Sequence, residues 1–487
     1  MKATDKLRKP KAGLLLLASP RFKNLDGPKR GSYHERKLKA VEEIKATMDF
    51  LDLSDPGIVY EREDAKRAMD LFYNDKVDFI YAEFLSWSED FAWIRFLRDC
   101  PDIPIIFCNV AKSRMTFETS LDEDDFVDYL CAGTLVGSLE GSGSIKRVPR
   151  ERVRTIAGTR EQITEKLKVY ARAARTRAIL RNSNLGLMAN MNEAMWSTYI
   201  DNYDLFTKIG PEIHYLPYSD YGTEIENLGE DEVKAYADSL TARYKMMDDV
   251  EYDKFIGCVK ATLAIKKMAE KNDIDCYVYN DIDQATFRTA GCRAGFYPQW
   301  FNDNVSVLVP EADIGAGLAT YILKLISGGH VNFIEPFHIE DDFGTFAGGH
   351  AGPNDHNDPA WQDNVVISRD VRFAKTSWKY AGAPFAWYRI SPGMKTVAGL
   401  FEEDGRYKLV VFQAESLSEK DTPQSSKKHL LATYTHTIFK PVVPVKELFE
   451  KVLNIGTTQH FAIVDGDWRA ELEEFAAMMG FEFYNIK

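Results

Sequence analysis

Cysteine is scarce in this chain, and none of it is spaced to form a cross-link or a thiolate site. Six cysteines occur in 487 residues, and no two of them form a Cys-x-x-Cys motif. Scattered cysteines of this kind neither build a disulfide framework nor bind zinc as a cluster. Those in apolar stretches, such as Cys108 after Phe107, are expected to be buried free thiols. The pattern predicts a protein of a reducing, cytoplasmic compartment.

An excess of positive charge and long apolar runs are also missing. Lysine and arginine number 61 against 74 aspartates and glutamates, which gives a formal net charge of −13. A nucleic-acid-binding protein needs a basic face to neutralise phosphates, and the sequence shows none. No run approaches the ~18 apolar residues of a membrane-spanning helix. The apolar stretch 12–19 is short for a signal peptide and predicts a buried strand. We therefore expect neither nucleic acid nor membrane as a partner.

The first third of the chain alternates between two kinds of segment. Helical spacing of apolar residues occurs at 37–52 and 62–72, and a long helix is predicted at about 159–181. Short apolar segments predict buried strands at 13–18, 57–60, 77–82 and 103–108. Continuous apolar strands that alternate with helices indicate a parallel, doubly wound sheet covered by helices on both faces.

The same alternation restarts after the long helix and then gives way to a different pattern. Strands are predicted at 185–189, 212–216, 276–279 and 305–309, with a helix at 197–209 among the helical segments between them. The last third is rich in β-branched and aromatic segments, including 386–390, 395–400, 408–414 and 430–438, which favours antiparallel strands in a barrel or sandwich.

The fold class predicted from these patterns is α/β. Two doubly wound parallel-sheet (Rossmann-like) domains, 1–181 and 182–332, are followed by a mainly antiparallel β domain, 333–487.

The residues best suited to chemistry gather late in the chain. Segment 331–358 is the densest mixture of carboxylates and imidazoles, and oxygen and nitrogen ligands of this kind suit Mn²⁺, Mg²⁺, Co²⁺ or Fe²⁺. Composition alone leaves a metal site and a polar surface loop equally open. Glu311 follows the apolar run 305–309, where ligands bind in open α/β sheets. A glutamate there can equally be a favourable charge at a helix N-terminus.

Three short segments resemble the metal-binding segments of L-arabinose isomerases: 310–314 (PEADI), 333–335 (FIE) and 348–350 (GGH). Segment 459–460 (QH) and the helix after it are similar to the C-terminal segment that carries the fourth ligand in that family. Segments 57–87 and 130–133 resemble the N-terminal domain of the L-fucose and L-arabinose isomerases. The resemblance implies that Glu311, Glu335, His350 and His460 bind Mn²⁺ or a similar divalent cation.

The resemblance also implies an activity, a substrate and an assembly. The activity is that of an aldose–ketose isomerase, an intramolecular oxidoreductase of carbohydrate metabolism that acts on a free sugar through an enediolate. Glu311 and Glu335 would carry the proton between C2 and C1. Arg21 and Trp87 would contact the sugar, although core or interface packing also explains Trp87. Because a neighbouring subunit completes the sugar site in the related isomerases, a homo-oligomer, a tetramer or hexamer, is expected.

Several alternatives stay open at the level of sequence. His338, His356 or the acidic run 340–342 could replace Glu335 as a ligand, and His460 could be a strand-edge residue bonded to a backbone carbonyl. Segment 19–23 (SPRFK) differs from the sugar-contacting loop of arabinose isomerases, so the substrate sugar is open. The same metal site would also suit an epimerase or a lyase, and tandem α/β domains occur in non-catalytic sugar-binding proteins. Identification of the product distinguishes an epimerase or a lyase from an isomerase, and metal content distinguishes a non-catalytic sugar-binding protein from all three.

Overall fold

The chain folds into two compact units. The computed structural model describes residues 3–112, 114, 122–148, 152–188, 190–370, 382–423 and 435–487. The smaller unit is Arg8–Ala178, and the larger unit combines Met1–Leu7 with Ile179–Lys487. The division predicted at residues 181 and 332 is finer than this one and stays a prediction.

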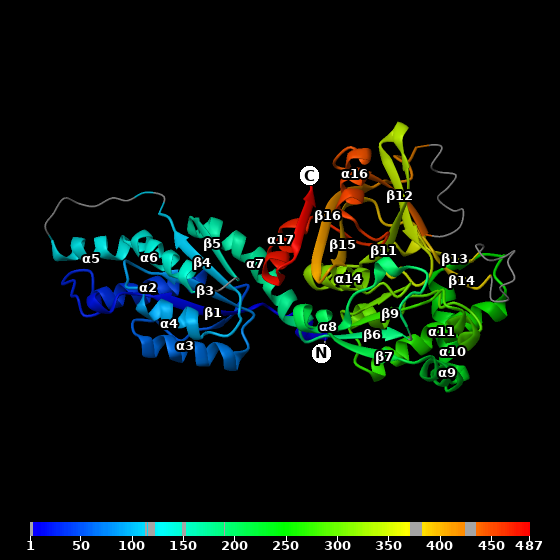
Figure 1. The fold of residues 1–487 in the computed structure, drawn as a ribbon, viewed down its shortest axis with the longest axis horizontal. Helices are drawn as coiled ribbons and strands as arrows, with labels where there is room; N and C mark the ends of the chain where they lie inside the picture. Colours follow the sequence, from blue (N-terminus) through cyan, green and yellow to red (C-terminus); the bar gives the residue numbers. More distant parts are fainter. Residues whose placement is uncertain are drawn as a thin grey trace. The chain divides into compact units, whose positions relative to one another are not determined.

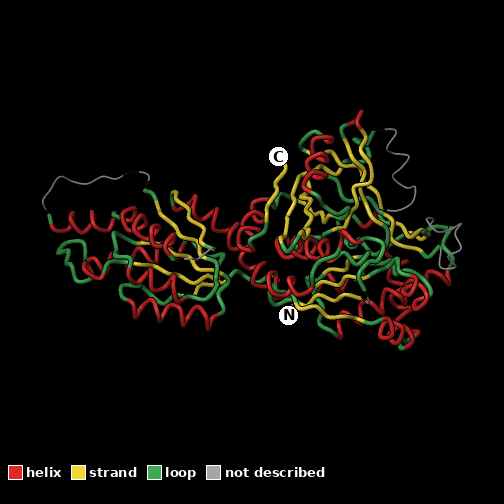
Figure 2. The backbone as a smooth tube through the Cα atoms, in the orientation of Figure 1, coloured by secondary structure: helices red, strands yellow, loops and turns green. Residues whose placement is uncertain are grey.

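The smaller unit is built on a parallel sheet with helices on both sides of it (Figures 1 and 2). Its strand order is β2-β1-β3-β4-β5, and all of its pairings are parallel. The strands are β1 (Lys11–Leu17), β2 (Asp52–Ser54), β3 (Phe79–Phe84), β4 (Ile105–Val110) and β5 (Val153–Gly158). The helices are α2 (Tyr33–Ala46), α3 (Arg62–Asp75), α4 (Phe91–Asp99), α5 (Glu123–Ala132), α6 (Thr134–Arg147) and α7 (Arg160–Leu180), the last of which contains the unit boundary.

Apolar side chains from three helices and the sheet form the core of this unit. Phe72 of α3, Trp93 of α4 and Ile145 of α6 join Phe84 and Phe107 of the sheet in one buried cluster. The strand expected at 57–60 was wrong, since this segment makes only an isolated bridge between Leu17 and Val59. Proline at 56 lacks an N–H, and Gly57 has a φ of 82°, so the backbone turns there instead of pairing.

The larger unit contains a second parallel sheet, with strand order β10-β9-β6-β7. Its strands are β6 (Asn184–Met188), β7 (Glu212–Leu216), β9 (Cys276–Tyr279) and β10 (Val307–Val309). Side chains from α9 (Tyr218–Glu226), α10 (Glu230–Arg243) and α11 (Tyr252–Lys271) pack with this sheet in one core. Short helices α12 (Gln284–Ala290) and α13 (Gln299–Asp303) lie in the connection from β9 to β10.

The single helix expected at 197–209 is broken into three short pieces. A 3-10 turn (Trp196–Thr198) is followed by α8 (Asn202–Asp204) and a π-helical turn (Leu205–Ile209). Tyr199 is extended, and the Asp201 side chain accepts the backbone N–H of Asp204 to start a new turn. Apolar spacing is kept, but this local capping interrupts the helix.

Six antiparallel strands form a closed ring in the last third of the chain. The ring runs β15-β18-β11-β12-β17-β16 and closes through the pairing of β15 with β16. Its strands are β11 (Asn332–Glu340), β12 (Thr345–His350), β15 (Gly393–Glu403), β16 (Arg406–Ser416), β17 (Thr435–Pro441) and β18 (Phe461–Asp465), and β19 (Glu482–Ile486) adds in parallel to β16. The protein is therefore α/β with a mainly antiparallel C-terminal part. Residues 430–434 of one predicted strand lie outside the described residues.

Further elements attach to the ring and to the parallel sheet. Helices α16 (Val445–Ile455) and α17 (Arg469–Met479) follow ring strands, and a small sheet joins β8 (Lys245–Met246), β13 (Val366–Arg369) and β14 (Pro384–Trp387). None of the helices in the described ranges has both the length and the apolar character needed to cross a membrane.

Helix α14 (Ile314–Ser327) joins the parallel sheet to the ring. It contacts β9 and β10 of the sheet as well as β15 and β18 of the ring. Every residue from Ile314 to Ile326 is buried. A helix that is buried on all sides needs apolar residues around its whole circumference, and α14 has them. Its N-terminus therefore lies where the sheet and the ring meet.

Candidate metal centre

The register of three ring strands brings together three of the four predicted ligands. In the β11–β12 pair, Glu335 lies opposite Gly349, the neighbour of His350. In the β11–β18 pair, Ile334 lies opposite Phe461, so the next step along the two strands places Glu335 beside His460. Antiparallel pairing thus flanks Glu335 with the two strands that carry the histidines, with His460 opposite Glu335 and His350 one residue beyond its partner Gly349.

The fourth residue, Glu311, comes from the carboxyl end of β10, just before α14. Glu311 and Ala312 both have left-handed backbones, with φ of 63° and 55°. This conformation is costly for residues other than glycine and persists where surrounding contacts hold it. Here the end of β9 does so, because Asp281 Oδ1 accepts the Glu311 N–H at 2.9 Å and the Tyr279 carbonyl accepts the Ala312 N–H.

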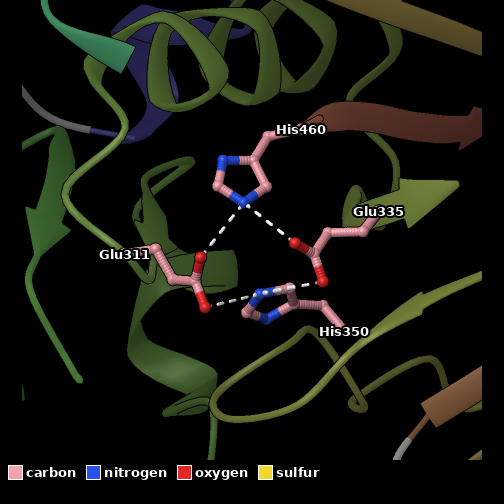
Figure 3. Close-up of side chains that lie close together, drawn as sticks. All are labelled: Glu311, Glu335, His350 and His460. Carbon is pink, nitrogen blue, oxygen red and sulfur yellow. Dashed lines mark ion pairs between the residues drawn. The ribbon is translucent and has the colours of Figure 1, made fainter. Parts of the chain in front are cut away.

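The four side chains point toward one another (Figure 3). Glu311 lies between the histidines, with one oxygen 3.2 Å from His350 Nε2 and the other 3.2 Å from His460 Nε2. Glu335 is 3.9 Å from His350 Nε2 and 3.5 Å from His460 Nε2. Glu311 and both histidines are buried, whereas the Glu335 side chain keeps 23% of its exposure. The group is therefore reachable from the Glu335 side.

Both imidazole rings are held by their Nδ1 atoms. His460 Nδ1 lies 2.8 Å from Asp313 Oδ2, and His350 Nδ1 lies 2.6 Å from the Ala351 carbonyl oxygen. Because these partners accept hydrogen bonds, each Nδ1 carries a proton and donates it. In the neutral rings the Nε2 lone pairs then face the glutamate oxygens. Ring orientation by a carboxylate or carbonyl is typical of metal-binding histidines.

This arrangement fits a divalent cation. The four candidate ligand atoms all lie within 4.8 Å of one another. Ligands at about 2.0–2.2 Å from one ion are separated by at most about 4.4 Å. The four carboxylate–imidazole contacts are shorter than that, and they use both oxygens of each glutamate. Glu311 Oε2 and His460 Nε2 are buried and have no hydrogen-bond partner among the described residues. A cation between them would satisfy both atoms.

Without a cation, protons must balance the charge at this group. Burial alone would raise the pKa of Glu311, but His350 and His460 outweigh it and hold that pKa far below its usual range. Burial alone would lower the pKa of His460, but Asp313, Glu311 and Glu335 outweigh it and hold that pKa well above its usual range. The carboxylates thus favour positive charge at the centre of the group, which a proton or a metal ion can supply.

The alternative ligands named from the sequence lie elsewhere. The side chain of His338 is 39% exposed and lies 3.6 Å from Glu340. His356 is buried, but its Nε2 accepts the Tyr297 N–H and its Nδ1 contacts the Tyr244 hydroxyl, each at 3.1 Å. Both of its nitrogens are therefore used within the core. Within the described ranges, neither histidine joins the group of Glu311, Glu335, His350 and His460.

The two predicted sugar contacts belong to the smaller unit. The Arg21 guanidinium carbon lies 4.5 Å from the centre of the Trp87 ring, and Arg21 also pairs with Glu89. Phe22 packs against the same indole, with ring centres 5.5 Å apart. The structure thus brings Arg21 and Trp87 together, and their contact with a sugar stays a prediction.

Sequence reasoning missed two residues that support the group. Asp313 both caps α14, by accepting the Ala316 N–H at 2.8 Å, and faces His460. Phe333 packs against both histidine rings, with ring centres 4.7 and 4.6 Å away. Asp313 was within the segment that resembles the isomerases, so the N-cap position was the available signal. Phe333 lies in another such segment, 333–335, but its residue type does not distinguish it from other apolar strand residues.

We expect His356 to make stability depend on pH. Burial lowers its pKa from 6.5 to about 4, so between these values the unfolded state binds more protons than the folded state. The contribution is complete above about pH 6.5 and is lost as pH falls toward 4, by on the order of 3 kcal/mol. Chemical unfolding should show that the difference in free energy of unfolding between wild type and His356→Gln shrinks as the pH falls through this window. A constant difference would contradict the assignment.

Comparisons with known proteins do not identify the chain. No family model matches it, and no curated protein matches it. A solved structure to which it is similar is a crystal structure of an ABC sugar transporter (periplasmic sugar binding protein) from Legionella pneumophila. The two are 10% identical over 65% of this chain and 94% of that chain, with a TM-score of 0.16. Agreement at that level carries no argument about fold or function.

Proposed function

We propose that the protein is an aldose–ketose isomerase that depends on a divalent cation, Mn²⁺ or a similar ion. The observation that carries the proposal is the convergence of two carboxylates and two imidazoles, three of them buried and Glu335 accessible. A closed four-ligand site serves structure, whereas an accessible side leaves room for a substrate. The resemblance to arabinose and fucose isomerases supplies the reaction.

The proposed roles follow from burial and contacts. Isomerisation moves a proton from C2 to C1 of the sugar, so a group that accepts and returns a proton must reach both carbons. Both oxygens of Glu311 are enclosed by the two histidines, whereas Glu335 is the accessible carboxylate. We therefore assign the proton transfer to Glu335 and the fixed charge between the histidines to Glu311. The cation, when bound, would polarise the sugar carbonyl and stabilise negative charge on the sugar oxygens.

The finer architecture belongs to the same proposal. The order β2-β1-β3-β4-β5 and the order β7-β6-β9-β10 both place the first strand of the series inside the sheet, as doubly wound folds do. We propose three domains, two of this kind and one barrel, and a free sugar bound at the carboxyl end of the second sheet.

The activity is tested by incubating the metal-depleted protein with a panel of aldoses in D₂O, with and without Mn²⁺, and following the products by NMR. We expect a ketose, deuterium incorporation, and about one Mn²⁺ per chain by elemental analysis. An epimer or a fragmented sugar would assign a different reaction to the site. Bound sugar without turnover would favour a binding protein. Full activity after exhaustive EDTA treatment, with no metal found, would overturn the proposal.

We also propose a homo-oligomer, a tetramer or hexamer, because related isomerases complete the sugar site with the first domain of a neighbouring subunit. Light scattering at micromolar concentration should give a mass of four or six times 55.4 kDa. Substitution of Trp87 by alanine should raise the KM for sugar without changing the Mn²⁺ content. An active monomer would contradict this part of the proposal.

A further inference from the structure

A buried ion pair lies directly behind the candidate metal centre. The Arg293 side chain is 5% exposed, that of Asp281 is fully buried, and the two make a close ion pair in which Arg293 Nε donates. Asp281 follows β9, and Arg293 follows α12. Neither residue belongs to the group of four candidate ligands.

Each member of this pair makes a hydrogen bond to a backbone group that holds one of the candidate ligands in place. Asp281 Oδ1 accepts the N–H of Glu311 at 2.9 Å and so helps to hold the left-handed backbone there. Arg293 Nη2 donates to the Ala351 carbonyl oxygen at 3.3 Å. That same oxygen accepts from His350 Nδ1 at 2.6 Å. The Arg293 guanidinium therefore connects the groups that hold Glu311, at the end of the parallel sheet, with the carbonyl that holds His350, in the ring.

The backbone beside the guanidinium leaves space for it. Gly352 has a φ of 95°, and a Cβ atom at that position would lie 3.1 Å from Arg293 Nη2. A side chain there would meet the guanidinium and would also strain the backbone. Asp370 Oδ2 lies 3.7 Å from Nη1, which adds a second carboxylate to the surroundings of the arginine.

We propose that Arg293 is a positioning residue that fixes Glu311 and His350 relative to each other. It does so through Asp281 on one side and the Ala351 carbonyl on the other. Lysine at this position would keep the charge but lacks the planar fork that donates in two directions at once. The proposal rests on the proposed function only because the positions of Glu311 and His350 are measured through their Mn²⁺ affinity.

The test compares Arg293→Gln, Arg293→Lys and a matched control, Lys6→Gln. Lys6 makes a buried ion pair with Asp275, which precedes β9, whereas Asp281 follows the same strand. The control therefore breaks a buried pair at the other end of β9. Mn²⁺ affinity is measured by electron paramagnetic resonance, and hydrogen exchange of the peptide that contains Glu311 is measured in metal-free protein.

We expect both Arg293 variants to raise the Mn²⁺ dissociation constant by about 10- to 100-fold, the range seen when groups that orient metal ligands are removed. We also expect faster exchange at Glu311, and neither change in Lys6→Gln. Should Arg293→Gln fail to fold, Arg293→Lys and Gly352→Ala carry the same test. Unchanged affinity and exchange in a folded Arg293 variant would overturn the proposal, as would equal effects in Lys6→Gln.

A double substitution separates the two sides of the link. In the Asp281→Asn background, Arg293→Gln should weaken Mn²⁺ binding further, because the contact to the Ala351 carbonyl is still lost. Absence of any further loss would show that Arg293 acts through Asp281 alone and would refute the link to His350. If the wild type binds no Mn²⁺, the proposed cation site fails, and hydrogen exchange at Glu311 still decides whether Arg293 positions it.

Discussion

Glu311→Gln is expected to weaken cation binding by at least about 100-fold and to lower turnover with it. The buried Glu311 carboxylate lies 3.2 Å from each of the two histidines, closer than the Glu335 carboxylate does. Removing one partner of a buried charged group costs about 3–5 kcal/mol. Since about 1.4 kcal/mol is a factor of ten, the Mn²⁺ dissociation constant should rise by roughly 10²- to 10³-fold or more. Glutamine keeps the shape of the side chain, so the loss reports the charge.

This expectation is checked by titrating Mn²⁺ into metal-free wild type, Glu311→Gln and the control Glu340→Gln. Glu340 is a carboxylate of the same unit that ends β11 and lies outside the ligand group. The control should bind Mn²⁺ as the wild type does. Wild-type affinity in a folded Glu311→Gln protein would mean that the cation, if there is one, is held elsewhere.

His460→Ala should reduce turnover by about 100-fold. Loss of the ring opens one side of the group and removes the contacts to both glutamates, and a displacement of even ~1 Å at a reacting centre can cost that much. Asp313→Asn should weaken Mn²⁺ binding by about 10- to 100-fold. Asparagine caps helices as well as aspartate does, so the start of α14 is kept while the charge that faces His460 is lost.

The matched control for the histidine is His338→Ala, on the exposed part of β11. It should change the free energy of unfolding by about 1 kcal/mol or less and leave turnover intact. Steady-state rates and Mn²⁺ titrations on all three variants separate the outcomes. If His460→Ala keeps wild-type turnover and affinity, His460 is a buried structural residue and the ligand set is wrong.

The sequence was informative wherever a signal was local. The predicted strands matched β1, β3 and β4 of the first parallel sheet and all four strands of the second, but β2 and β5 were not predicted. The end of segment 305–309 placed Glu311 at a sheet edge from the sequence alone. Residues 160–180 form the long helix that amphipathic spacing predicts, because no proline or glycine interrupts it. The expected strand at 57–60 failed for a local reason too, since Gly57 turns the chain.

The geometry of the ligand group could not be predicted in the same way. Glu335, His350 and His460 meet because β11 pairs with β12 on one side and β18 on the other, in one particular register. Register depends on long-range pairing, and a shift by one residue would turn each side chain to the other face of the sheet. The left-handed pair at Glu311 and Ala312 is likewise set by β9, which precedes it by about thirty residues.

Helix α14 makes the larger unit thermodynamically indivisible. Since the residues from Ile314 to Ile326 are buried by the sheet and the ring together, a fragment that carried only one of these partners would expose an apolar helix face to water. Denaturation of the sheet and the ring should therefore be one cooperative event. A cation held by Glu311, just before α14, would then stabilise both by mass action, so metal concentration would tune the melting temperature of the sheet and the ring together.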